Sequence, residues 1–208
     1  MGMKTGRGKE KQRDIEKRKR KSTFLFAAEG NNVTEKNYFK AINSDRVHVI
    51  FTKGNETDPV KLMNRLIEES KNLDPELGDR AFCLVDADVN PVKDQQIADA
   101  DNAARKTLAV QIVSNPCFEI WFLDHFRYTT TQFRSSADAI AALMDEFPLY
   151  AKNNPDMYVR LKDKQDEAIK NAKRQEQHNL DNGRKPHTAK FQPSTEVYKI
   201  IEALRSLK

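Results

Sequence analysis

Short apolar runs that end abruptly in polar residues alternate with helix-forming segments in the first part of this chain. Such runs, rich in β-branched and aromatic residues, predict buried strands. They lie at 22–28, 46–52, 81–90 and 108–116. Because helical segments separate them, the pattern predicts a parallel sheet built from right-handed βαβ units.

The segments between and after these runs have helical patterns. Helices are expected at 33–42, 58–70, 93–106 and 117–126 within the α/β part, and at 136–147, 156–178 and 194–207 beyond it. The helix expected at 58–70 begins with Asp58 and Pro59, a favourable pair at a helix N-terminus. The expected organisation is a disordered basic tail at 1–21, an α/β domain at 22–127 and a helical extension at 128–208, packed on the core.

The positive charge of the chain is concentrated in its tail. The whole chain of 208 residues has a net charge of +5, but residues 1–21 alone carry ten Lys or Arg and three Asp or Glu. This tail is expected to be either a solubilising segment or an arm that binds the phosphates of nucleic acid. The rest of the chain is close to neutral.

Composition also bears on localisation. The two cysteines, Cys83 and Cys117, lie inside apolar runs and are expected to be buried thiols. Together with the lack of an apolar signal segment and of a long apolar run, this favours a cytoplasmic protein that does not contact a membrane.

Acidic residues follow two of the predicted strands. Glu29 ends the first run, and Asp86 and Asp88 end the third. In a parallel sheet, ligands bind beyond the carboxyl ends of the strands, so these side chains are expected to meet there. Carboxylates that lie close together repel one another unless a cation or protons compensate them, and their oxygens suit Mg²⁺ or Mn²⁺. Each residue alone could instead cap a helix or lie in a solvated loop.

Three further residues have weaker signals. Glu119 lies among apolar neighbours, where a charge needs a partner, although an acidic residue also favours a helix N-terminus. Glu35 is expected to be an ordinary acidic residue of a first helical turn. Lys152 is either a surface lysine or a contact for a phosphate.

Several other kinds of site lack support. The sequence contains no P-loop, no Rossmann glycine fingerprint and no nucleophile-elbow motif. Its four histidines do not form a zinc-ligand pattern. Nucleotide-binding folds of those kinds, α/β-hydrolases and zinc enzymes are therefore disfavoured.

Three strings of residues resemble the RloB-like proteins. They are Glu29-Gly30-x-x-x-Thr34-Glu35-x-x-Tyr38-Phe39, Asp86-x-Asp88 and Ser114-Asn115-Pro116-Cys117-Phe118-Glu119-x-Trp121. The resemblance implies a Toprim-like parallel sheet of about four strands flanked by helices, related to OLD-type nucleases, with a C-terminal helical extension. It implies that Glu29, Asp86 and Asp88 bind Mg²⁺ (or Mn²⁺) and act in catalysis. It also implies that Glu119 and Ser114 support a second metal ion, and that Lys152 stabilises charge.

What the resemblance implies for function is a Mg²⁺-dependent nuclease that cleaves RNA or DNA in bacterial phage defence, encoded in restriction loci. Its partners would be nucleic acid and a defence protein such as an ATPase. The alternative is a non-catalytic module that senses a nucleotide or a partner. The near-neutral body of the chain, which predicts no obvious basic groove, favours this alternative.

Overall fold

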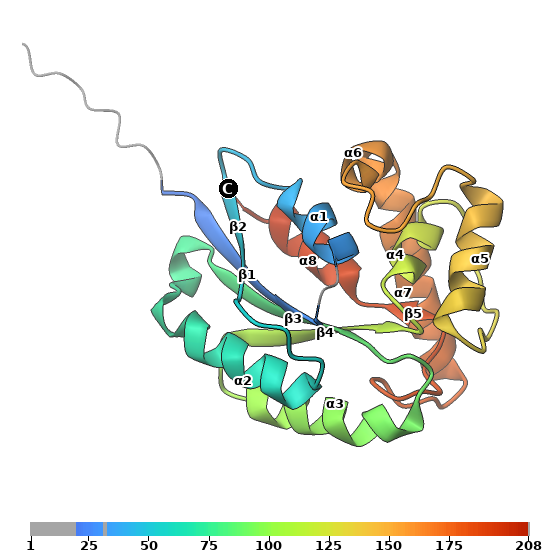
Figure 1. Cartoon of the computed structure of the whole chain (residues 1–208), viewed down its shortest axis with the longest axis horizontal. Coiled ribbons are helices and arrows are strands. Elements are labelled where there is room, and N and C mark those ends of the chain that lie inside the picture. The colour runs from blue at the N-terminus through green and yellow to red at the C-terminus, as the bar shows by residue number, and fades with distance from the viewer. Residues whose placement is uncertain (1–19, 31–32, 208) are drawn as a thin grey trace, which may run out of the picture.

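The computed structural model describes residues 20–30 and 33–207 (Figure 1). The predicted disordered tail lies outside these residues except for Arg20 and Lys21. Arg20 forms an ion pair of 2.9 Å with the fully buried carboxylate of Asp79. The last residues of the tail are therefore fixed to the folded body of the chain.

Five strands form one sheet in the order β2-β1-β3-β4-β5. Their bounds are Ser22–Ala28 for β1, Val47–Phe51 for β2, Arg80–Asp86 for β3, Ala109–Asn115 for β4 and Ser194–Thr195 for β5. The first four strands pair in parallel, and β5 pairs with β4 in the antiparallel direction. The predicted α/β fold with a parallel sheet is confirmed, and β5 extends the sheet beyond the four predicted strands.

The α-helices connect and follow these strands. They are α1 (Val33–Lys40), α2 (Pro59–Glu69), α3 (Pro91–Ala104), α4 (Glu119–Asp124), α5 (Ser136–Glu146), α6 (Met157–Leu161), α7 (Gln165–Asp181) and α8 (Val197–Arg205). Asp58 caps α2 as predicted, because its side chain accepts a hydrogen bond from the backbone N–H of Lys61.

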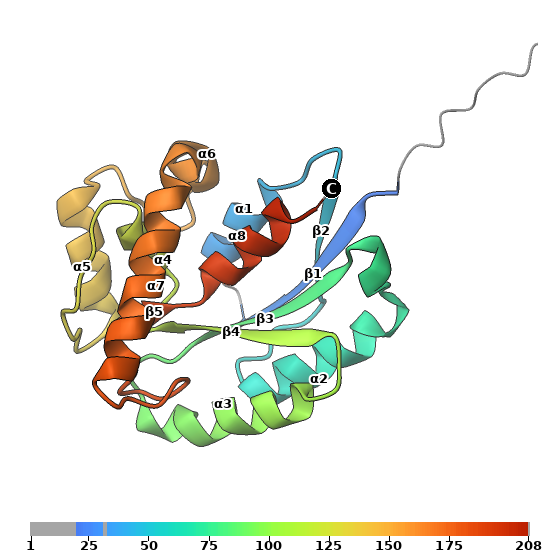
Figure 2. The ribbon, with the colours of Figure 1, turned by 180° about the vertical axis from the view of Figure 1, so that it is seen from behind.

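The helices cover both faces of the sheet. Helices α2 and α3 lie on one face, α1 and α8 lie on the other, and α4 to α7 gather at one end (Figures 1 and 2). Alternate residues of β1 point to the two faces: Leu25 packs with the α2 residue Leu62, and Phe26 packs with Phe39 of α1. The central strands β1 and β3 are thus buried on both faces, which explains their continuous apolar runs.

The C-terminal helices share a core with the sheet. Residues of α7 and α8, among them Ile169 and Ile201, belong to the same apolar cluster as Phe26 of β1. Buried amides of α7 also bind α4, since Gln175 donates a hydrogen bond of 2.7 Å to the carboxylate of Asp124. The division of the chain at residue 127 stays a prediction.

Two predicted helices differ from those observed. The single helix expected at 156–178 is two helices, α6 and α7, because α6 packs against α1 whereas α7 packs against α4 and α8. The helix expected at 194–207 begins only at Val197. Ser194 and Thr195 instead form β5, where they pair with the end of β4.

Two expectations drawn from composition can also be compared with the structure. Cys83 and Cys117 are both buried free thiols, as predicted. Within the described ranges, no helix combines the length and the apolar character needed to cross a membrane.

Candidate functional site

A cavity of about 200 Å³ opens at the carboxyl ends of β1 and β3. These strands are neighbours and run parallel, so the residues that follow them meet at one edge of the sheet. The cavity is lined by Glu29, Thr34, Glu35, Asp86, Asp88, Cys117, Glu119, Ser136, Ile140 and Lys152. The four predicted metal ligands and the predicted catalytic lysine are therefore brought together in one place.

The loop that carries Asp86 and Asp88 is held against the end of β4. The backbone N–H of Ala87 donates to the carbonyl of Ser114 at 2.8 Å, and that of Asp88 donates to the carbonyl of Pro116 at 2.9 Å. Asp88 has a φ of 54°, a left-handed conformation that is uncommon for a residue with a side chain. These two hydrogen bonds fix the turn that aims both carboxylates at the cavity.

Lys93, in the first turn of α3, lies among these carboxylates. Its ammonium nitrogen is 2.7 Å from Asp88 Oδ2 and 3.0 Å from the backbone carbonyl of Asp86. It is also 3.2 Å from Glu29 Oε1. The side chain is only 16% exposed. Lys93 was missed at the sequence level, because nothing in the pattern of 93–106 indicates where its long side chain reaches.

Glu119, the first residue of α4, also lines the cavity. Its side chain is buried and accepts a hydrogen bond of 2.7 Å from the hydroxyl of Tyr150. The loop after Tyr150 is tied to α1, because the backbone N–H of Asn153 donates to Thr34 Oγ1 at 3.1 Å. This contact places Lys152, between them, at the cavity wall.

Glu35, which was expected to be an ordinary acidic residue of a first helical turn, lines the cavity. It is buried, with 5% of the residue exposed, and burial together with the charge of Glu119 raises its pKa to about 7, against the opposing effect of Lys152. Its burial could have been predicted from the sequence, because Glu35 lies three and four residues before Tyr38 and Phe39, on the buried stripe of the helix.

The carboxylates of the cavity repel one another. Burial raises the pKa of Asp86, and the charges of Glu35, Glu119, Glu29 and Asp88 raise it further. Burial likewise raises the pKa of Glu29, against the lowering effect of Lys93. Such a cluster favours the binding of protons or of a cation.

The donor set fits a hard divalent cation, because it consists of carboxylate oxygens and a backbone carbonyl. Glu29, Asp86, Asp88 and Glu119 would hold such an ion. Within residues 20–30 and 33–207, however, no three Asp, Glu, His or Cys side chains are already arranged around a metal position. Lys93 lies among the carboxylates instead, and the predicted metal site stays a prediction.

The raised pKa of Glu35 predicts how stability depends on pH in the absence of metal. Its folded-state pKa of about 7 lies above the ordinary glutamate pKa of 4.5, so the folded state binds the proton more tightly. Between about pH 8 and about pH 6, the melting temperature should therefore rise, by about 2–4 °C from this residue.

Thermal melts in a chelator, compared between the chain and its Glu35→Gln variant, check this prediction. The variant should show a smaller rise, because its amide does not titrate. Titrating groups outside the cavity act alike in both proteins and cancel in the comparison. Glu68→Gln, at a surface position, is the control and should behave as the unmodified chain. Identical pH profiles for the chain and Glu35→Gln would contradict the assignment.

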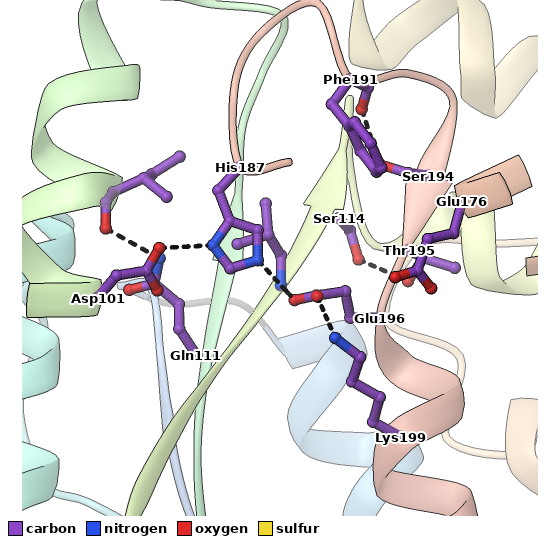
Figure 3. Close-up of polar contacts among 12 residues, drawn as sticks. Asp101, Gln111, Ser114, Glu176, His187, Phe191, Ser194, Thr195, Glu196 and Lys199 are labelled. Carbon is purple, nitrogen blue, oxygen red and sulfur yellow. Dashed lines mark hydrogen bonds and ion pairs between the residues drawn. The ribbon is translucent and has the colours of Figure 1, made fainter. Parts of the chain in front are cut away.

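Ser114 does not line the cavity, although it was expected to support a second metal ion. Its hydroxyl is buried and lies 2.9 Å from Thr195 Oγ1 of β5 (Figure 3). It therefore joins β4 to β5, which the sequence reading did not predict as a strand.

A charged network beside β5 fixes the segment that precedes it. The imidazole of His187 is 2.7 Å from Asp101 Oδ2 and 3.0 Å from Glu196 Oε2 (Figure 3). Glu196 Oε2 also accepts from the backbone N–H of Val113, and its other oxygen pairs with Lys199. Because both imidazole nitrogens face carboxylates, His187 is held as the cation, and these contacts raise its pKa to about 10 despite burial.

The fold and the cavity define a class of protein. A mostly parallel α/β sheet presents an acidic cavity at the carboxyl ends of its strands, where proteins of this architecture bind ligands. The family model for RloB-like protein matches residues 24–204, and the chain therefore belongs to the RloB-like family. No curated protein and no solved structure matches the chain.

Proposed function

We propose that this RloB-like protein is a Mg²⁺-dependent phosphodiesterase that cleaves RNA or DNA in bacterial phage defence. The observation that carries the proposal is the gathering of five carboxylates in one cavity: Glu29, Glu35, Asp86, Asp88 and Glu119. The proposal includes the Toprim-like relationship to OLD-type nucleases that the sequence resemblance implies.

The residues of the cavity have distinct expected tasks. Glu29, Asp86 and Asp88 would hold a divalent ion, with Glu119 as a further ligand. When bound, the ion would activate a water molecule and stabilise charge on the leaving oxygen. Lys152 would place a positive charge beside the phosphate that undergoes cleavage.

The substrate would be recognised mainly through its phosphates. Residues 1–21 carry a net charge of +7, which favours a polyanion because bound counterions are released from it. The remaining residues are close to neutral overall, so they contribute less to this attraction. A partner ATPase that controls access to the site belongs to the same proposal.

Cleavage assays test the proposed activity. The purified chain, incubated with end-labelled RNA and DNA in Mg²⁺ or Mn²⁺, is expected to cleave at least one of them. Glu29→Gln and Asp86→Asn should each lower the rate by about 100-fold or more, because several kcal/mol of charge stabilisation depends on the ion. Asp145→Asn, at an exposed position on α5, is the matched control and should keep full activity. Equal cleavage by all four proteins would contradict the assignment of Glu29 and Asp86 to the active site.

The alternative is a module that senses a nucleotide or a partner without turnover. The near-neutral body of the chain favours it, since a nuclease usually presents a basic groove to its substrate. Titration calorimetry with nucleotides and Mg²⁺ distinguishes the two functions. Tight binding, together with no cleavage of any nucleic acid, would favour the sensing module.

A further inference from the structure

Lys93 makes the contacts that a bound cation would make. Its ammonium group has three donors, and four acceptor atoms of three residues lie within hydrogen-bond reach: both carboxylate oxygens of Glu29, the carbonyl of Asp86 and Asp88 Oδ2. Two carboxylates and a backbone carbonyl are also typical oxygen ligands of a hard divalent ion. The ammonium therefore occupies a position whose surrounding oxygen atoms would also suit such an ion.

The position of Lys93 in the first turn of α3 indicates that its side chain is held in place by the carboxylates of Glu29 and Asp88. Asn90 caps α3 and Pro91 is its first residue, so Lys93 lies in the first turn. A positive charge in the first turn of a helix is unfavourable, because the helix dipole is positive at this end. Glu29 and Asp88 compensate for this effect, whereas Asp86 and Glu119 make no ion pair with Lys93.

We propose that Lys93 is a built-in counter-ion that occupies the cation position between Glu29 and Asp88 in the metal-free protein, and that a divalent ion binds there by displacing it. The inference rests on the proposed function, since it concerns the same site. In this arrangement, the lysine keeps the acidic loop ordered before metal arrives. It also weakens metal binding, because its charge must leave the site first.

Metal binding by a charge-removing variant tests the inference. Calorimetric titration of Mn²⁺ into Lys93→Met is expected to give a dissociation constant lower than that of the unmodified chain by about tenfold or more, because one competing positive charge is gone. Lys61→Met, at an exposed position of α2, is the matched control and should bind as the unmodified chain does. Lys93→Arg keeps the charge and should show no such gain.

A second measurement uses the unmodified chain and does not depend on how Lys93→Met folds. Lysines are methylated with formaldehyde and a borane reductant, with and without Mn²⁺, and the modified peptides are quantified by mass spectrometry. Lys93 should be protected without the ion and should react several-fold faster with it, as displacement predicts. The rate at Lys61 should not change.

The outcomes separate this inference from the proposed function. If the unmodified chain binds Mn²⁺ but Lys93→Met binds no more tightly, and the methylation of Lys93 does not increase, the displacement of Lys93 is wrong while the metal site stands. If neither the chain nor any variant binds Mn²⁺, both the inference and the proposed metal-dependent function are wrong.

Discussion

Replacing Asp86 by asparagine is expected to raise the melting temperature of the metal-free chain and to remove its metal-dependent activity. The first effect follows from repulsion, because burial and four neighbouring carboxylates raise the pKa of Asp86. A neutral amide of the same shape relieves this repulsion, with a gain of about 1–2 kcal/mol in the free energy of unfolding, or about 3–6 °C. The second effect follows because Asp86 would be a ligand of the ion.

Calorimetric melts in a chelator and cleavage rates in Mg²⁺ measure the two effects on the same protein preparations. The opposite signs make the prediction specific, because a residue that only supports the fold would lose stability on substitution. Asp145→Asn should change neither quantity. A lower melting temperature for Asp86→Asn would mean that the carboxylate of Asp86 stabilises the metal-free fold, which would contradict the expected repulsion among the cavity carboxylates.

Replacing His187 by alanine is expected to destabilise the chain by about 3 kcal/mol, which lowers the melting temperature by about 6–12 °C. The substitution leaves Asp101 without its cationic partner and removes the contact that joins α3 to the start of α8. His48→Ala, at an exposed position of β2, is the matched control and should change stability little. Thermal melts at neutral pH measure both variants, and equal melting temperatures would show that the network does not contribute.

The same network predicts a loss of stability in alkali. The pKa of His187 is raised from 6.5 to about 10, so its contribution is fully present below about pH 6.5 and is lost as the pH rises through about 10. The pKa of Glu196 is lowered to about 2 by His187 and Lys199, against the effect of burial, so its contribution is lost only as the pH falls through about 2. His187→Ala should therefore lose less stability than the unmodified chain between neutral pH and about pH 10.

Sequence patterns predicted the part of the site that depends on strand order. Glu29, Asp86 and Asp88 could be placed together because each lies at or just beyond the end of a parallel strand, and such strands end at one edge of a sheet. Glu35 could have been recognised from its spacing to the buried Tyr38 and Phe39. The acidic type of the residue suggested an ordinary helix start instead.

Long side chains and distant contacts could not be predicted in this way. The reach of Lys93 depends on how α3 is set against the loop after β3, which the sequence pattern does not specify. The contact of His187 with Asp101 spans 86 residues along the chain, and His187 lies in a segment without periodicity. Strand β5 was not predicted either, because its two residues are too few to show the alternation of a strand.

The position of a bound divalent ion tests the central claim most directly. Crystals of the chain grown with Mn²⁺ would show the ion by its anomalous scattering, without reference to any substrate. An anomalous peak is expected in the cavity, within about 2–2.5 Å of carboxylate oxygens of Glu29, Asp86 or Asp88. An empty cavity at a saturating Mn²⁺ concentration, with Lys93 still bound to Glu29 and Asp88, would contradict it.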